Sequence, residues 1–351
     1  MATRHTPLKR SPASTELPRL LAQGGGVAEI VRLAWPSARA RTVVRWVGRS
    51  DQNRGMVSAV QKGLRRRSLQ SYLSFVRFEH TLFALPFAYG GMLLAAEGWP
   101  GWTTFVWVTL AMVGARTASM ALNRVLDVEI DSQNPRTAGR EIPAGHLGKV
   151  DGMVLVVAGF ALLALAAWSL NRLTLALLPV AVFFLALYPL TKRWTWLCHY
   201  WLGITIGAAA PAGWIAVAGA FSGAAVALWL GVALWVAGFD IIYALLDIDF
   251  DRESGLQSAP VRFGEERALA LSAWSHGAAV VSLAALLLLA DRGVPFAASL
   301  VVVGCVLALE QRLARKRSAS AALASFNSNL VVGLAVLVGL VVDLVVAPAG
   351  P

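Results

Sequence analysis

Residues 152–170 read GMVLVVAGFALLALAAWSL, nineteen residues without a charged side chain. A helix of this length is close to the roughly 20 residues that cross the hydrocarbon core of a bilayer. Because runs this long and continuously apolar are not the alternating segments of a β-barrel, the sequence predicts an all-α polytopic membrane protein. Similar runs flank this one, and we expect nine spans, at about 82–97, 102–122, 152–170, 173–190, 197–219, 224–246, 268–290, 294–309 and 327–347.

The composition excludes a water-soluble globular protein. Of the 351 residues, 57% are hydrophobic and 15% are charged, whereas soluble domains average about 45–50% apolar and 25% charged residues. The two cysteines provide neither a disulfide framework nor a zinc signature.

All the excess positive charge lies at the N-terminus. Residues 1–70 contain 14 basic and three acidic residues, a net charge of +11, so residues 71–351 are neutral overall. No stacking aromatics are interleaved with the basic residues, so we expect a positive-inside anchor rather than a partner for nucleic acid. We interpret residues 1–70 as a disordered basic arm, an over-long gene start whose true start is Met56, or a transit peptide. Residues 71–351 are then the transmembrane domain.

Basic residues in alternate loops predict the orientation. One side of the predicted bundle receives only Arg172 and Arg292, and the other receives twelve basic residues. We therefore expect the N-terminus and the charged loops to be cytoplasmic and the C-terminus to lie outside. Arginine outnumbers lysine 26 to 5, which favours a GC-rich bacterial source and its cytoplasmic membrane over the alternative, a mitochondrial inner membrane.

Two acidic segments end predicted spans on the charged side. Residues 123–131 read NRVLDVEID, and residues 243–251 read YALLDIDFD. Helix geometry places residues i, i+4 and i+8 on one face. The first face would hold Asn123, Asp127 and Asp131, and the second Asp247 and Asp251.

The same geometry turns Glu129 and Asp249 away from these faces. Two acidic faces at one membrane surface repel each other unless cations lie between them, and carboxylates suit Mg²⁺, which is usually shared with substrate phosphates. The alternative is that the acids only mark a membrane boundary.

Basic residues follow the acids closely, as a phosphate substrate requires. Arg136 and Arg140 lie on a Pro- and Gly-containing loop, and Lys192 and Arg193 lie in the next charged loop. One guanidinium group can donate two parallel hydrogen bonds to the oxygens of a phosphate group. Positive-inside topology alone is the other explanation.

Arg116 precedes Asn123 by seven residues, about two turns deeper on the same face. It either pairs with carboxylates or holds an acidic group of an organic substrate. Arg77, with Glu79 and His80 at the start of the first span, poses the same choice.

These segments resemble the UbiA superfamily of intramembrane prenyltransferases. That family has nine helices, an N-D-x-x-D-x-x-x-D motif after the second, a D-x-x-x-D motif introduced by Tyr-Ala after the sixth, and a loop ending in Pro-x-Gly, here residues 143–145. The resemblance covers about residues 70–350.

The resemblance implies roles for individual residues. The expected ligands of two Mg²⁺ ions that hold an isoprenyl diphosphate are Asn123, Asp127, Asp131, Asp247 and Asp251. The expected substrate-binding residues are Arg136, Arg140, Lys192, Arg193, Tyr188 and Tyr243 near the diphosphate, with Arg116 near the aromatic acceptor and Arg77 as a further candidate. A dry pocket would shield an allylic carbocation from water while an aromatic carbon attacks it.

Three departures leave the acceptor open. Arg124 replaces the second motif residue, Asp; Val128 stands where many 4-hydroxybenzoate polyprenyltransferases carry Arg; and residues 255–258 read GLQS instead of GIKS. Residues 78–87 and 134–143 are similar to a bacterial branch described as 4-hydroxybenzoate polyprenyltransferase-like. That branch is associated with menaquinone made by the futalosine route, which would use a dihydroxynaphthoate.

We therefore expect a Mg²⁺-dependent enzyme of ubiquinone or menaquinone synthesis. It would join a polyprenyl group, entering from membrane lipid, to a hydroxylated aromatic acid. The alternatives are another aromatic acceptor, of the haem, chlorophyll or homogentisate type, and a cation transporter, which would need acids near the bilayer midplane and helices interrupted in both halves.

Overall fold

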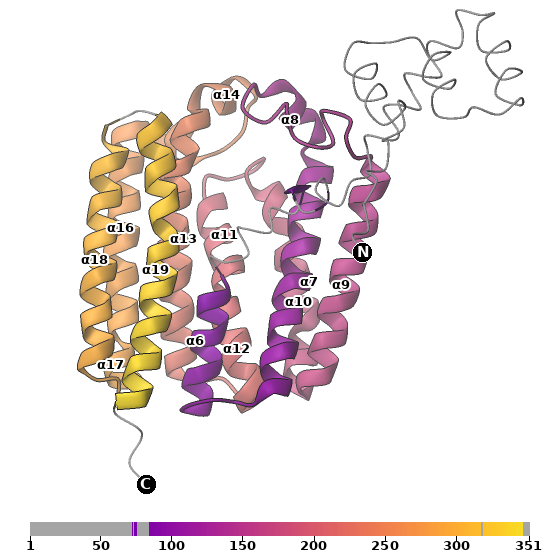
Figure 1. Ribbon diagram of the computed structural model, residues 1–351. Coiled ribbons are helices and arrows are strands. Elements are labelled where there is room, and N and C mark those ends of the chain that lie inside the picture. The colour runs from indigo at the N-terminus through magenta and orange to yellow at the C-terminus, as the bar shows by residue number, and fades with distance from the viewer. Residues whose placement is uncertain (1–71, 73, 76–83, 317–318, 347–351) are drawn as a thin grey trace, which may run out of the picture. The chain divides into compact units, whose positions relative to one another are not determined.

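Each predicted apolar run forms helix, and the helices stand side by side (Figure 1). The computed structural model describes residues 72, 74–75, 84–316 and 319–346, which belong to one compact unit, residues 69–351. The predictions for residues 1–70 and for Arg77 therefore lie outside the described residues.

The polytopic all-α prediction is confirmed. Within the described residues, eight helical segments are long and apolar enough to cross a membrane, and the shorter α6 is a ninth apolar helix. The helices of these nine segments are α6 (Leu85–Ala96), α7 (Trp102–Leu126), α9 (Lys149–Leu170), α10 (Arg172–Thr191), α11 (Cys198–Gly207), α12 (Ala209–Ala218), α13 (Gly223–Ala244), α16 (Glu265–Ala284), α17 (Leu286–Leu289), α18 (Val294–Ala314) and α19 (Ala319–Val346).

Two predicted spans are interrupted. The run 197–219 divides into α11 and α12 at Ala208. Pro211 has no N–H to donate to the carbonyl group of Gly207, and its ring crowds that carbonyl, so the ladder of helical hydrogen bonds breaks here. The run 268–290 divides into α16 and α17 at Ala285, and this run contains no proline.

The long helices pack mainly in pairs. α7 packs on α9, α12 on α6, α11 and α16 on α13, and α18 on α19. α13 is the most buried of the candidate spans. It therefore forms the centre of the bundle, and its packing holds its side chains in place.

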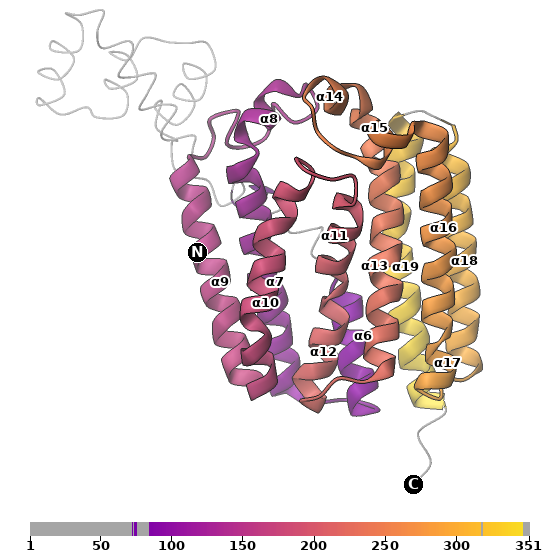
Figure 2. The ribbon, with the colours of Figure 1, turned by 180° about the vertical axis from the view of Figure 1, so that it is seen from behind.

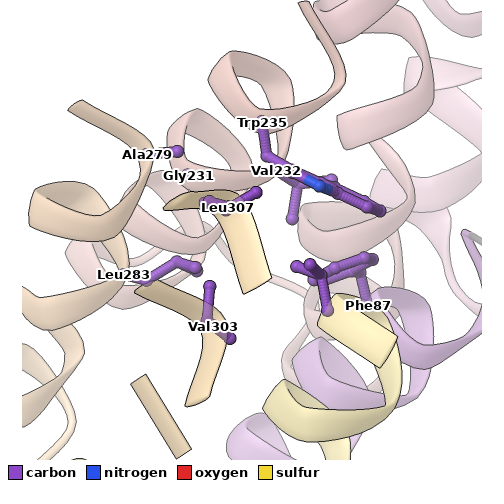
Figure 3. Close-up of a pocket in the computed structure, with 9 residues that line it drawn as sticks. Phe87, Gly231, Val232, Trp235, Ala279, Leu283, Val303 and Leu307 are labelled. Carbon is purple, nitrogen blue, oxygen red and sulfur yellow. The ribbon is translucent and has the colours of Figure 1, made fainter. Parts of the chain in front are cut away.

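The core beside α13 is filled. Figure 3 shows Phe87 of α6 and Trp235 of α13 facing Leu283 of α16 and Val303 of α18. The ring centres of Phe87 and Trp235 are 5.0 Å apart, and the space between these side chains has no room for a water molecule. This region is packing core.

Two glycines let α6 and α12 touch along their backbones. A Cβ atom on Gly91 would lie 2.0 Å from the carbonyl oxygen of Ala210, and one on Gly213 would lie 2.0 Å from that of Ala88. Small residues of this kind are typical of close helix pairs in membranes.

Short helices gather at one end of the bundle. α8 (Val128–Gln133) follows α7, and α14 (Ile248–Glu253) follows α13 after a 3₁₀ turn over Leu245–Asp247. α15 (Ala259–Phe263) comes next. Figures 1 and 2 show α8 and α14 close together beyond the ends of the long helices, so the two acidic segments share one end.

Candidate active site

In the first acidic segment, Asp127 and Asp131 form ion pairs with basic side chains of the same protein. Asp127, buried between α7 and α8, pairs with the ammonium group of Lys192, and its Oδ1 lies 3.1 Å from Nη2 of Arg193. Asp131, buried in α8, accepts hydrogen bonds at both oxygens, 2.8 Å each, from Nη1 of Arg140. Asp127 and Asp131 are therefore each neutralised by basic side chains.

The second acidic segment is joined to the first through Asp247. The guanidinium group of Arg136 donates to both oxygens of Asp247, with Nε 2.8 Å from Oδ1. Nδ2 of Asn134 donates to the same Oδ1 at 3.0 Å. The hydroxyl oxygen of Tyr243 accepts from Nη1 of Arg136 at 2.9 Å, and the guanidinium group lies 5.2 Å from the ring centre. The loop after α8 is thereby tied to the end of α13.

Arg136 stays charged in this setting. Burial alone would lower the pKa of its guanidinium group. The hydrogen bond to Asp247 and the negative potential of Tyr243, Asp247 and Asp131 outweigh burial and raise the pKa above its ordinary value.

The remaining acids divide as the helical geometry predicts. Asp251 of α14 is half-buried and within electrostatic range of Asp247 and Lys192. The Asp249 side chain is 86% exposed and pairs with Arg252 at 3.4 Å, and Glu129 is exposed. The prediction that Glu129 and Asp249 turn away is confirmed.

A buried ion pair holds the loop that carries Arg136 and Arg140. Arg124 of α7 is only 4% exposed and pairs with Glu141, and its guanidinium group lies 5.3 Å from the ring centre of Phe75. Oε1 of Glu141 accepts a hydrogen bond of 2.6 Å from the hydroxyl group of Ser74. Arg124, which replaces the second residue of the family motif, thus forms an ion pair with the loop.

Deeper in the bundle, α7 contacts α10 through polar groups. Nδ2 of Asn123 donates to the hydroxyl group of Tyr188 at 3.1 Å. Arg116 is within electrostatic range of the same hydroxyl group. The predicted acceptor-binding arginine is therefore one layer deeper than the motif carboxylates.

Sequence analysis missed four further residues. Asn134, Glu141, Asp240 and His199 all take part in the contacts of this region. Asp240 carried a usable signal, because an acid inside an apolar span marks a functional site. The other three become visible only when the loops are folded against the helices.

An apolar cavity of about 110 Å³ lies among the long helices. It is lined by residues of five helices, among them Ala88, Met112, Ala167, Leu178 and Gly213. Met112 precedes Arg116 by four residues and so lies one turn further from the motif acids on α7. The cavity can take hydrocarbon rather than charge.

The donor set fits a hard cation. Within the described part of the chain, no three Asp, Glu, His or Cys side chains are grouped closely enough to hold a metal ion as they stand, because basic side chains take up the carboxylate oxygens. The acids supply only oxygen donors, which Mg²⁺ prefers. Asn134 and Arg136 bring the two acidic segments together.

The model of the UbiA prenyltransferase family matches residues 84–334. The 4-hydroxybenzoate octaprenyltransferase of Marinobacter nauticus is 31% identical over 281 residues, which is 79% of this chain and 95% of that protein.

The apo structure of a UbiA homolog from Aeropyrum pernix K1 aligns with a TM-score of 0.70 and 37% identity over 76% of this chain and 98% of that one. A UbiA homolog from Archaeoglobus fulgidus, solved with DMAPP and Mg²⁺, shares the fold at 20% identity and a TM-score of 0.61, over 78% of this chain and 99% of that one. The family model covers most of the chain, and the acidic segments and their cations lie where the motifs predict them, so this protein belongs to the UbiA prenyltransferase family.

Proposed function

We propose that this protein transfers a polyprenyl group from a polyprenyl diphosphate to a hydroxylated aromatic acid and requires Mg²⁺. One observation carries the proposal. Four carboxylates on two segments and four cations from two loops gather at one end of an apolar bundle, and Arg136 bridges the segments. This arrangement suits a ligand that is a polyanion at one end and a hydrocarbon at the other.

The motif residues would hold the metal. The ligands would be Asn123, Asp127, Asp131, Asp247 and Asp251. Bound Mg²⁺ would stabilise the negative charge that develops on the leaving diphosphate.

The basic residues would bind the diphosphate itself. Arg136, Arg140, Lys192 and Arg193 hold carboxylates in this structure. During the reaction these cations would face the phosphate oxygens. These oriented donors would stabilise the negative charge that develops on the oxygen joining the diphosphate to the prenyl group. Stabilisation of this kind is usually the largest single contribution to catalysis.

The acceptor would lie one layer deeper. Arg116 would pair with its carboxylate, and Tyr188 would line the same space. The relatives named 4-hydroxybenzoate octaprenyltransferase support a monocyclic acid and ubiquinone synthesis. The motif pattern of residues 134–143 supports a dihydroxynaphthoate and menaquinone synthesis.

The cellular setting follows from the same residues. The active end carries the basic loops, so we assign it to the cytoplasmic face of a bacterial cytoplasmic membrane. The prenyl chain would enter from lipid, and residues 1–70 would be a basic arm on that face. A cation transporter is disfavoured because the four motif acids lie at helix ends on one side.

The test is Mg²⁺-dependent transfer of radiolabelled polyprenyl diphosphate by purified protein. 4-Hydroxybenzoate and 1,4-dihydroxy-6-naphthoate are offered in separate assays, with Asp247→Asn as the inactive variant and exposed Asp249→Asn as its matched control. A labelled lipid formed with one acceptor, lost without Mg²⁺ and in Asp247→Asn only, supports the proposal. Metal-independent transfer, or no transfer to any hydroxylated aromatic acid, overturns it.

A further inference from the structure

A carboxylate inside the central helix has no role in the mechanism above. Asp240 lies in α13, and its Oδ2 is 2.7 Å from Nδ1 of His199 in α11. The histidine side chain is 3% exposed, whereas the Asp240 side chain is 26% exposed. A partly exposed carboxylate in the most buried span costs free energy unless it has a binding partner or a ligand.

The protonation of His199 follows from its second contact. The backbone N–H of Ala259 donates to Nε2 of His199 at 3.1 Å. A nitrogen that accepts a hydrogen bond carries no proton, so the imidazole ring is neutral and its proton is on Nδ1. His199 therefore donates to Asp240 and orients it, and the negative charge of Asp240 remains.

Asp240 lies behind the second motif along the chain, as Arg116 lies behind the first. It precedes Asp247 by seven residues, just as Arg116 precedes Asn123. In a continuous α-helix seven residues are about two turns, roughly 10 Å, and in the second stretch a 3₁₀ turn over Leu245–Asp247 forms the last part. One acid and one base therefore each lie about two turns behind the motif of their own segment.

Tyr188 connects the two positions. Its hydroxyl group is within electrostatic range of both Arg116 and Asp240. Ile241 and Ile242, beside Asp240, are buried, whereas Tyr243 and Asp247 are partly open. The exposed part of the Asp240 side chain therefore lies on the same side of the segment as Tyr243 and Asp247.

We propose that Asp240 binds the phenolic hydroxyl group of the aromatic acceptor and accepts its proton during transfer, and that His199 is a positioning residue that orients Asp240. This inference rests on the proposed function. Arg116 at the carboxylate end and Asp240 at the hydroxyl end would together select acceptors with both groups.

The chemistry balances. The carbon–oxygen bond of the prenyl diphosphate breaks, and its electron pair leaves with the diphosphate. A ring carbon next to the hydroxyl-bearing carbon bonds to the allylic carbon while the phenolic proton passes to Asp240, which gives a neutral cyclohexadienone. The substituted ring carbon then loses its hydrogen as a proton, and Asp240 returns its proton to the oxygen. One proton is released with the diphosphate overall.

The main experiment compares wild-type protein with Asp240→Asn, using geranyl diphosphate, Mg²⁺ and whichever hydroxylated acid the wild type accepts. We expect turnover to fall at least about 100-fold, the usual size of a general-base effect. We also expect the KM for geranyl diphosphate to be unchanged and the ratio of geraniol to prenylated acid to rise, because water captures more of the cation. A variant that was only structurally damaged would lose both products together.

An acceptor analogue isolates the hydroxyl contact. Where the wild type accepts 4-hydroxybenzoate, benzoate serves as the competitive inhibitor, and where it accepts the naphthoate, 2-naphthoate does. The analogue lacks the hydroxyl group, so its inhibition constant should be the same in wild type and Asp240→Asn. An equal weakening of the analogue and the true acceptor would overturn the assignment, as would normal turnover in the variant.

Two further variants guard against a folding failure. Asp240→Glu keeps a carboxylate and should recover part of the turnover, and His199→Gln keeps an N–H donor and should lose only about tenfold. If Asp240→Asn does not insert, full activity in both of these variants overturns the proposal. A wild-type protein that prenylates no hydroxylated aromatic acid overturns the proposed function itself, which is a distinguishable result.

Discussion

Arg136 and Asp247 join the two acidic segments of this protein. The guanidinium group of Arg136 donates to both carboxylate oxygens of Asp247 and also to the hydroxyl oxygen of Tyr243. A paired, planar contact of this kind is the arrangement in which arginine also binds phosphate. The same side chain can therefore exchange Asp247 for a diphosphate without changing its hydrogen-bonding pattern.

Replacing Arg136 with lysine should weaken the binding of the prenyl diphosphate. Lysine keeps the charge but loses the two-pronged geometry. We expect the KM for the diphosphate to rise about tenfold, with a smaller change in the KM for the aromatic acid, measured by steady-state transfer. Arg252→Lys is the matched control, because Arg252 is exposed and pairs only with Asp249. An equal effect of both substitutions would contradict the prediction.

Asp127→Asn should abolish the response to Mg²⁺. Asp127 is buried and lies against Lys192 and Arg193, so the substitution removes a charge that we propose binds metal, and it leaves two cations without their acidic partner. We expect at least a 100-fold loss of turnover across a Mg²⁺ titration. Glu129→Gln, two residues away and exposed, should titrate like the wild type. Restoration of full turnover in Asp127→Asn by excess Mg²⁺ would show that this residue only tunes metal affinity.

The Arg124–Glu141 pair predicts strongly non-additive stability. Both side chains are largely buried, and removal of one partner of such a pair costs about 3–5 kcal/mol, whereas apolar replacement of both is often neutral. Arg124→Met and Glu141→Leu should each lower the thermal unfolding temperature in detergent. The double variant should recover most of the loss. Additive losses would mean that the two side chains act independently.

Gly91→Ala should destabilise the bundle. The new methyl group would lie 2.0 Å from the carbonyl oxygen of Ala210, so α6 and α12 would have to separate at a cost of about 1–3 kcal/mol. Gly277→Ala is the control, because a Cβ on this exposed residue of α16 meets nothing within 4 Å. That change should be neutral or stabilising by up to about 1 kcal/mol. Thermal unfolding of both variants decides the comparison.

The membrane fold could be predicted from the sequence because bilayer thickness fixes the length of an apolar run. The acidic faces could be predicted because Asp127, Asp131 and Glu129 follow helical geometry, and burial separates them as expected. The breaks at Ala208 and Ala285 could not be predicted from hydropathy alone. An apolar run has the same composition whether or not its helix is continuous.

The pairing of charges was also beyond the sequence. Arg136 is five residues from Asp131 in the sequence, yet it binds Asp247, on a different segment. Which carboxylate an arginine binds depends on how the loops fold back over the helix ends. The spacing of residues in the sequence does not determine this. Arg124 was recognised only as a departure from a family pattern, and its partner Glu141 appeared only with the folded loop.

The balanced charges at the active end have a consequence for the order of binding. Asp127, Asp131 and Asp247 pair with Arg136, Arg140, Lys192 and Arg193, and Asp251 lies within electrostatic range of Lys192, which makes four acidic and four basic groups. A metal ion alone would have to separate the carboxylates from these cations, and a diphosphate alone would have to separate the cations from the carboxylates. Ligands of opposite sign that arrive together satisfy both sets, and each raises the affinity of the other by the same factor. On the proposed mechanism, these ion pairs favour joint binding of the metal and the diphosphate over binding of either one alone.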